Sequence, residues 1–447
     1  MLLPFYGVPE TIAQALERHR EVFFREEGFA HVSRYITGLV LSPNKTLQGI
    51  YNAQAWGGEK PSRRAMHEAV FEAGWDSEEL MAGHREAVAE DHRGRGREVI
   101  SLDWTACHHA RGPKIYAATP AYDYVEKRYL LHQTVVTAVI SNREWIDGLE
   151  LVAQEPSKLE EEVAYLKATA KQQYEHMEQV QQRLLELLHH LKHKLEYKKR
   201  TEIAVEIVKQ IEAEGHFPRA NYAFDTGVLT LELTRFIEGR GKHWVSELEC
   251  PRHINWYGYW RRVDEVALEL RQHHPESFRS LQVNCRNGET QEFWAFTKVV
   301  RLKRYGCKRL VIVHGEQDLT DTPRFLVTDA LHWESGRVIE TWSYRWASET
   351  FHEFSKQVTG LESAQVRKEE AVKRHFRLSC ITQSIIQRAP ASASKSERFA
   401  FAKGNITFGQ KCRAIARESF LNLLNLVKHL FARGQSTQQV LEVLMPA

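Results

Sequence analysis

The segment Trp342-Ser-Tyr-Arg345-Trp-Ala-Ser-Glu349-Thr-Phe-His-Glu-Phe-Ser-Lys356 predicts a helix whose charged and apolar side chains lie on opposite faces. At about 100° per residue, Arg345, Glu349 and Lys356 fall within roughly 40° of one another, with Trp342 beside them. The apolar side chains gather on the other side, and these are Ala347, Phe351, Phe354 and Val358. An ordinary amphipathic helix with an i,i+4 Arg–Glu pair has the same pattern. Whether this segment is an ordinary surface helix or part of a functional site therefore depends on acidic residues elsewhere in the chain.

The first of these acids is Asp103, which follows the apolar run 99–102 and so lies at the predicted end of a buried strand. The runs 114–118 and 129–140 also have strand-like composition. Together the three segments predict an antiparallel meander with the acid on its first strand. A single aspartate at a strand end is more often a cap or a turn residue, so Asp103 alone indicates no site.

The second acid is Asp225, which follows the short predicted strand 220–224 and precedes a predicted helix, 226–238. Asp329 is a rival that also ends an apolar run, but it lies only 20 residues before Glu349 (349 − 329). Two strand-end acids and one helical acid in a mixed sheet suit a two-metal site, where carboxylates hold divalent ions about 4 Å apart.

The segment from Trp342 to Lys356 resembles the Tyr-x2-Arg-x3-Glu-x6-Lys signature of bacterial insertion-sequence DDE transposases. Arg345, Glu349 and Lys356 match this signature in spacing, whereas Trp342 stands where the family has Tyr and lacks its phenol hydroxyl. The resemblance extends over roughly residues 95–360. It implies three metal-binding catalytic acids, Asp103, Asp225 and Glu349, and three DNA-binding residues, Arg345, Lys356 and Trp342.

The resemblance implies an α/β fold with an RNase H-like catalytic core on a mixed sheet, and a protein that cleaves and joins strands at transposon ends. Its cofactors would be two Mg²⁺ ions, with Mn²⁺ as a substitute. Its partners would be double-stranded DNA, as terminal inverted repeats and as target, and a second copy of the chain in an active homodimer. The expected location is the bacterial cytoplasm, at the nucleoid.

Three other functions share parts of this pattern. An RNase H-like nuclease would carry the same acids but would not join strands. A retired transposase would keep DNA binding without catalysis, although it would be free to lose one of the acids. A coiled-coil scaffold would carry the acids incidentally and would show no dependence on a metal.

The spacing of the acids predicts insertions in both gaps of the core. The second gap contains strand-like runs and Trp256, Trp260 and Trp294. In relatives an aromatic from this region stacks on a flipped base, although a Trp in such a run is more often part of the core. The predicted organisation is a helical DNA-binding domain (1–95), a catalytic core (96–250 and 324–360), a long helical insertion within it (157–214), a β-rich insertion (251–323) and a basic helical C-terminal region (361–447).

The insertion in the first gap predicts a long helix, because 157–200 contains neither Pro nor Gly. Its apolar positions follow alternating steps of four and three, which is a heptad pattern interrupted by one Gln. These positions are Leu159, Val163, Leu166, Ala170, Gln173, Met177, Val180, Leu184, Leu187 and Leu191. The pattern fits either a coiled-coil arm that dimerises or bridges transposon ends, or a helix folded back onto residues 201–214.

Composition and charge indicate which partners and which cellular compartment are expected. The net charge of +3 does not by itself indicate nucleic acid, but residues 357–447 contain 14 Lys and Arg against 6 Glu and no Asp. Such a basic tail suits a phosphate backbone. The six cysteines have no CxxC spacing, which argues against a zinc ribbon and for reduced thiols in a cytosol. No apolar run reaches the length of a membrane span, so no membrane partner is expected.

Overall fold

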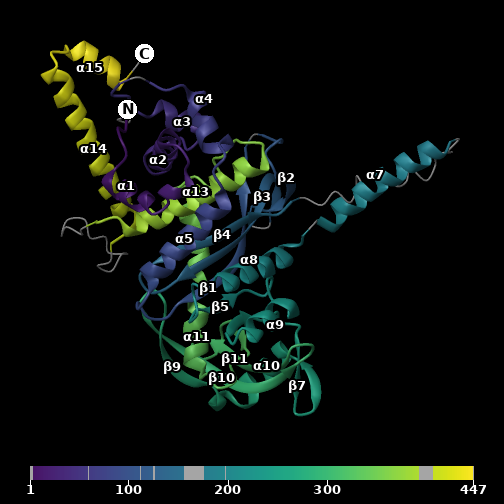
Figure 1. The fold of residues 1–447 in the computed structure, drawn as a ribbon. Coiled ribbons are helices and arrows are strands. Elements are labelled where there is room, and N and C mark those ends of the chain that lie inside the picture. Colours follow the sequence, from purple (N-terminus) through teal and green to yellow (C-terminus); the bar gives the residue numbers. More distant parts are fainter. Residues whose placement is uncertain are drawn as a thin grey trace.

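The computed structural model describes residues 4–58, 60–110, 112–123, 126–155, 176–196, 198–391 and 406–445. It shows a mixed α/β protein built on one 12-stranded sheet that contains parallel and antiparallel pairs (Figure 1). The strands follow the order β2-β3-β1-β5-β6-β12-β11-β10-β7-β8, with β4 paired to β3 and β9 paired to β10. The predicted α/β class with a mixed sheet is therefore confirmed.

The strands are β1 (Val99–His108), β2 (Thr119–Asp123), β3 (Arg128–Ser141), β4 (Ile146–Ala153), β5 (Asn221–Phe224), β6 (Trp244–Glu247), β7 (His253–Trp256), β8 (Tyr259–Arg262), β9 (Arg279–Asn284), β10 (Thr290–Leu302), β11 (Gly306–His314) and β12 (Arg324–Thr328). The helices are α1 (Glu10–Glu17), α2 (Glu26–Leu41), α3 (Leu47–Asn52), α4 (Arg63–His67), α5 (Ser77–His92), α7 (Met177–Glu196), α8 (Arg200–Glu214), α9 (Leu231–Gly239), α10 (Val263–His273), α11 (Ser335–Ser343), α12 (Trp346–Gln357), α13 (Glu369–Arg388), α14 (Phe408–Ala432) and α15 (Thr437–Leu444).

Helices cover both faces of the sheet. The apolar residues of α8, α9 and α10 form one buried cluster with Leu102, Phe224 and Leu310 on one face. On the other face α11 packs through Val338 against Val311 and its neighbours. Because adjacent residues of a strand point to opposite faces, the residue after Leu102 points towards the α11 and α12 side.

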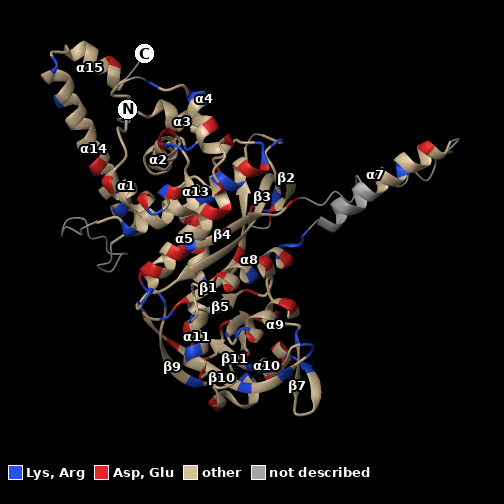
Figure 2. Cartoon of the chain, in the orientation of Figure 1, with Lys and Arg blue, Asp and Glu red and all other residues tan. Residues whose placement is uncertain are grey.

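The N-terminal and C-terminal helices share one core. Val32 and Ile36 of α2 pack in the same buried cluster as Leu378 and Ile381 of α13. Helix α13 is buried along most of its length, and several of its buried polar groups are hydrogen-bonded, as where Arg374 donates to the Trp75 carbonyl at 2.6 Å. Lys, Arg, Asp and Glu are interspersed over most of the described elements (Figure 2). The regions predicted as 1–95 and 361–447 therefore pack together as one helical body.

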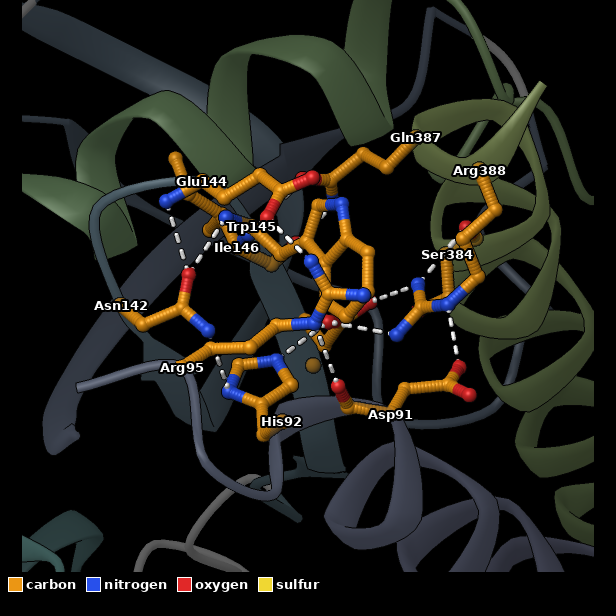
Figure 3. A network of polar contacts seen from close by, with 12 residues as sticks. Asp91, His92, Arg95, Asn142, Glu144, Trp145, Ile146, Ser384, Gln387 and Arg388 are labelled. Atoms are coloured by element: carbon orange, nitrogen blue, oxygen red, sulfur yellow. Dashed lines mark hydrogen bonds and ion pairs between the residues drawn. The ribbon is translucent and has the colours of Figure 1, made fainter. Parts of the chain in front are cut away.

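Figure 3 shows a polar network that ties this helical body to the turn between β3 and β4. The centre of the Trp145 ring lies 4.1 Å from the guanidinium carbon of Arg95 and 4.7 Å from that of Arg388. The Gln387 side chain of α13 accepts a hydrogen bond from the Ile146 N–H at 2.7 Å and donates another to the Ile146 carbonyl. The network thus attaches α5 and α13 to the hairpin β3–β4 of the sheet.

Three predicted boundaries were wrong. The segment 114–118 forms turns, and the next strand is β2. The predicted helix 226–238 begins only at α9, because Thr230 caps it by accepting the Leu233 N–H, and the preceding residues form turns. The single helix predicted across the signature is broken into α11 and α12, because Tyr344 is buried and the backbone there makes i→i+3 bonds, such as Arg345 N–H to the Trp342 carbonyl.

The insertions are also partly visible. Residues 157–175 of the predicted long helix lie outside the described residues, and the remainder forms two separate helices, α7 and α8. Figure 1 shows α7 extending away from the sheet, whereas α8 packs on β3 and β4. The choice between a coiled-coil arm and a helix folded back onto residues 201–214 stays a prediction. The predicted β-rich segment 251–323 does contain strands, but β10 and β11 continue the sheet of β1 through β12 instead of forming a second sheet.

Within the described ranges, no helix is both long enough and apolar enough to cross a membrane.

Candidate active site

The sheet brings Asp103 and Asp225 to neighbouring positions. Strands β1 and β5 are parallel and stay paired until Leu102 and Phe224, so the two acids are the next residue on each strand. Strand β5 ends there, whereas β1 continues to His108 beside β3. Asp103 is therefore a mid-strand residue, not the strand end that was predicted, and it lies where β1 loses one neighbour. Both carboxylates start from the same row of the sheet, at the carboxyl end of the parallel pair.

Asp225 is held by a tight turn after β5. Its Oδ1 accepts the Gly227 N–H at 2.8 Å. A Cβ on Gly227 would lie 2.7 Å from Cη2 of Trp104, so only glycine lets this turn approach the ring without displacing it. The turn and the residue after Asp103 thus pack directly against each other.

Glu349 is carried by α12, which lies over β1 and β3. Ser348 is hydrogen-bonded to Ser101 at 2.6 Å between hydroxyl oxygens, and Nε2 of His352 lies 2.8 Å from Oγ1 of Thr137. Ser101 is two residues before Asp103 and Thr137 pairs with Asp103 across the strands. All three strand residues therefore point to the face that α12 covers, and these contacts fix the rotation of the helix over the acid.

Arg345 connects two of the three acids. Its Nη1 lies 3.6 Å from Oδ2 of Asp103, and its Nη2 donates a hydrogen bond to Oε1 of Glu349. Its guanidinium carbon lies 5.2 Å from the centre of the Trp342 ring. Trp342 is only 6 % exposed and packs in the core beneath α11. The tryptophan is thus placed to support the guanidinium rather than to face solvent.

The surroundings of Asp103 disfavour the charged form of its carboxyl. Burial and the neighbouring Asp225 raise its pKa to about 7, and Glu349 adds to this rise, whereas the Trp104 N–H and Arg345 oppose it. The pKa is raised because the charged form is desolvated and repelled by nearby carboxylates. A cation at this position would relieve both effects.

The donor chemistry of the three acids suits Mg²⁺, which prefers oxygen ligands. Among the described residues, however, no three His, Cys, Asp or Glu side chains are grouped closely enough to hold a metal ion. The Arg345 guanidinium lies between Asp103 and Glu349 and balances their charge. The three acids therefore fit the ion by the type of their donor atoms, and their side chains would have to turn towards one another to hold it.

The Lys356 side chain of α12 contacts β1 at a position beyond Asp103. Its Nζ donates to the Ala106 carbonyl at 2.6 Å and lies 3.5 Å from Oε1 of Glu362. Ala106 is three residues beyond Asp103, which corresponds to about 10 Å along a strand. The structure thus brings Arg345 and Glu349 to Asp103, while Lys356 lies on the same helix at a distance from the acids.

A cavity of about 570 Å³ adjoins this site on the same side of the sheet. Its wall includes Trp342 and Trp346, which flank Arg345 in the chain, together with Phe293 and Arg286. Burial lowers the pKa of Arg286 to about 10, and its backbone N–H donates to the Ser343 hydroxyl at 2.9 Å. Arg286 and Trp346 carry no signal in the sequence pattern, because only the folding of β9 and β10 over the α11–α12 junction brings them together.

The other candidates lie elsewhere. Asp329 follows β12, which is antiparallel to β6, so it lies at the edge opposite the acids. There it accepts the Trp244 N–H at 2.9 Å and lies 2.7 Å from Nδ1 of His243. Of the three tryptophans in 251–323, Trp256 is buried, Trp294 is partly buried and Trp260 is exposed. Asp329 is thus a structural cap on β6.

The raised pKa of Asp103 makes a prediction for the metal-free protein. The folded protein binds the Asp103 proton more tightly than the unfolded chain does, because folding raises the pKa of this carboxyl to about 7. The free energy of unfolding is therefore highest below the unfolded pKa, and this contribution is lost as the pH rises through 7. Asp103→Asn removes the loss, so in EDTA the variant should gain roughly 2–4 kcal/mol relative to wild type between pH 4 and pH 8. Urea unfolding across this range measures the difference. Glu353→Gln, an exposed acid of α12, is the control, and parallel curves for Asp103→Asn and wild type would contradict the assignment.

No protein-family model matches this chain, and no curated protein matches its sequence.

Proposed function

We propose that this protein is a DNA transposase of an insertion sequence, which cleaves strands at the transposon ends and joins them to target DNA by metal-assisted phosphoryl transfer. The observation that carries the proposal is the meeting of Asp103 and Asp225 on adjacent parallel strands, with Glu349 held over Asp103 by α12. The three acids come from segments far apart in the chain. Asp225 and Glu349 lie close enough to Asp103 that both contribute to the rise in its pKa.

The strand order supports the RNase H-like core expected from the resemblance. Strands β4, β3 and β1 are antiparallel neighbours, and β5 and β6 continue the sheet in parallel with β1. Helix α8 precedes β5, α9 lies between β5 and β6, and α12 carries the third acid. The segment between β6 and α11 contains β7 to β12, which supports a β-rich insertion before the third acid.

In this mechanism Asp103 would contact both divalent ions, and Asp225 and Glu349 would hold one each. When bound, the two ions would supply activation of the attacking hydroxyl and stabilisation of the leaving oxygen. Arg345 would hold a phosphate beside Asp103, since its planar guanidinium matches phosphate oxygens. Lys356 would neutralise a phosphate farther along β1, and Trp342 would keep the Arg345 guanidinium in place.

The test is cleavage and joining of a labelled duplex carrying the DNA that flanks the coding sequence, with the full-length protein and Mg²⁺. Cutting at a repeat end followed by joining to a second duplex would support the transposase. Cutting without joining would favour an RNase H-like nuclease. Specific binding without cutting, under conditions that vary the metal, would favour a retired transposase that acts as a DNA-binding protein.

A further inference from the structure

The hairpin β7–β8 presents aromatic side chains to solvent at the far edge of the sheet. Strand β7 pairs with the end of β10, and β8 is the outermost strand. Tyr257 and Tyr259 are each 75 % exposed and Trp260 is 47 % exposed. Three exposed aromatics within four residues form a surface that water solvates poorly, and such a surface marks an interaction site.

The backbone of this hairpin's turn is strained at Tyr257, whose side chain is mostly exposed. Tyr257 and Gly258 both have positive φ, +48° and +96°, which is the two-residue turn that favours Asn-Gly. A residue with a Cβ at the first position costs free energy, and an exposed Tyr recovers little of it by burial. Strain of this kind is concentrated at ligand-binding positions. The tyrosine ring at the tip is therefore better explained by a partner than by stability.

Cations accompany the aromatic rings. Nζ of Lys298 lies 3.7 Å from the centre of the Tyr257 ring and 4.5 Å from that of Trp256. The neighbouring turn between β10 and β11 adds Lys303 and Arg304, both exposed. In the described part of the chain, none of Lys298, Lys303 and Arg304 forms an ion pair, and Figure 2 shows Lys and Arg around β7.

The acids of the hairpin region lie beside arginines, and Glu265 shares Arg262 with Asp264 at 3.9 Å. Asp264 pairs with Arg262 at 2.5 Å, and Glu269 pairs with Arg261 at 2.5 Å. The excess charge of the surface is therefore positive. A polyanion whose grooves also offer apolar groups complements exposed cations and aromatic rings, and duplex DNA has both properties through its phosphates and thymine methyl groups.

The hairpin lies in line with the catalytic acids across the sheet. Pairing between neighbouring strands aligns one residue from each strand in a continuous row across the sheet. These residues are Leu102, Phe224, Ser246, Val327, Leu310 and Lys298. Leu102 precedes Asp103, so Lys298 lies five strands from the first acid, or about 24 Å at ~4.8 Å per strand. The hairpin is one to two strands farther, at about 30 Å, which is too far to reach a base at the catalytic site.

We propose that the β7–β8 hairpin, with Lys298, Lys303 and Arg304, binds double-stranded DNA about nine base pairs from the phosphate held at the acids. This distance follows from ~3.4 Å per base pair along a duplex. A two-stranded ribbon has the width that the major groove admits, and the three cations would contact the flanking phosphates. The inference rests on the proposed function for the position of the cut, but DNA binding by the hairpin can be measured without cleavage.

The test measures binding of the full-length protein to a fluorescein-labelled 30-base-pair duplex by anisotropy, without Mg²⁺, from 50 to 200 mM KCl. The triple variant Lys298→Gln, Lys303→Gln and Arg304→Gln should bind at least tenfold more weakly at 100 mM KCl. The slope of log affinity against log salt should fall by about 3, since three phosphate contacts are lost. Lys209→Gln, which removes an exposed lysine paired with Glu232 on α8 and α9, should bind like wild type.

A second variant separates folding from binding. Tyr257→Asn places the favoured residue in the turn, so its melting temperature should equal or exceed that of wild type. Its affinity for the duplex should nevertheless fall about fivefold with an unchanged salt slope, because an apolar contact in the groove and not a charge is lost. Wild-type affinity in both the triple variant and Tyr257→Asn would overturn the inference.

Two further outcomes keep the proposals distinguishable. If the hairpin variants lose affinity only for a 30-nucleotide single strand, duplex recognition by this surface is wrong. If they lose duplex binding but the wild type never cuts DNA, the hairpin inference stands and the transposase proposal fails. On a duplex that the wild type does cut, the triple variant should lose protection about nine base pairs from the cut, and loss only at the cut would contradict the geometry.

Discussion

Replacing Asp103, Asp225 or Glu349 by the corresponding amide is expected to lower the rate of strand cleavage by about 1,000-fold or more. Each amide keeps the size of the side chain but removes a negative charge that would hold a divalent ion. Such an ion supplies several kcal/mol of transition-state stabilisation, and about 1.4 kcal/mol corresponds to a factor of ten in rate. The rate is measured under single-turnover conditions with Mg²⁺, on a duplex that the wild type cuts.

Asp329→Asn is the matched control. Asp329 also directly follows a strand, but it is hydrogen-bonded to His243 and Trp244 at the opposite edge of the sheet. This variant should cut at the wild-type rate, and the three site variants should still bind the DNA. A site variant that retains cleavage would remove its residue from the proposed metal-binding set. Loss of cleavage in Asp329→Asn alone would make that residue the better second acid.

Removing the Asp147 carboxylate is expected to lower the free energy of unfolding by about 3–5 kcal/mol, the usual cost of breaking a buried ion pair from one side. Asp147 is fully buried behind the β3–β4 turn. Its oxygens lie 2.8 Å from Nε2 of His92 and 2.8 and 3.1 Å from the Arg388 nitrogens. Asp147→Ala would leave Arg388 without this partner at the contact between α13 and the sheet. Urea unfolding at pH 7 measures the loss.

Glu144→Ala is the control within the same network. Glu144 pairs with Arg95 at 2.6 Å, but both side chains are about half exposed, so its removal should cost about 0–1 kcal/mol. A loss in Asp147→Ala as small as in the control would contradict the role assigned to the buried pair. Asp147→Asn, which keeps the shape and removes the charge, provides the measurement if the alanine variant does not fold.

The pH dependence of the Asp147 contribution has a definite sign. Burial alone would raise the pKa of this carboxyl, but Arg388 and His92 outweigh burial and hold the pKa well below its usual range. A carboxyl with a depressed pKa contributes stability above its unfolded pKa, and this stability is lost as the pH falls through the folded value. Wild type should therefore lose its advantage over Asp147→Asn only in strongly acidic solution, below about pH 4.

Local patterns in the sequence were sufficient for several elements of the site. The apolar runs before Asp103 and Asp225 became β1 and β5, because continuous apolar runs suit strands buried on both faces. The spacing of Arg345 and Glu349 predicted that the two side chains meet, and they do, as an i,i+4 pair. These features depend on neighbours within a few residues, which a sequence pattern records directly.

Other features depended on partners distant in the chain. The break at Tyr344 could not be predicted, because burial of its ring against Val99 and Ala223 overrides a continuous helical pattern. The extent of β1 beyond Asp103 is decided by pairing with β3, and the joining of β10 and β11 to the main sheet is decided by β12. The shared core of α2 and α13 connects residues more than 300 positions apart.

The sequence by itself determined which residues could be catalytic acids, where several of the strands lie, and which face of α12 is charged. These properties follow from residue type and from the periods of strands and helices. Only the tertiary structure decided that Asp103 and Asp225 begin from the same row, that Arg345 lies between two acids, and that Asp329 belongs to the opposite edge. Strand order and direction set those positions, and they arise from burying one continuous sheet between helices, which no local segment encodes.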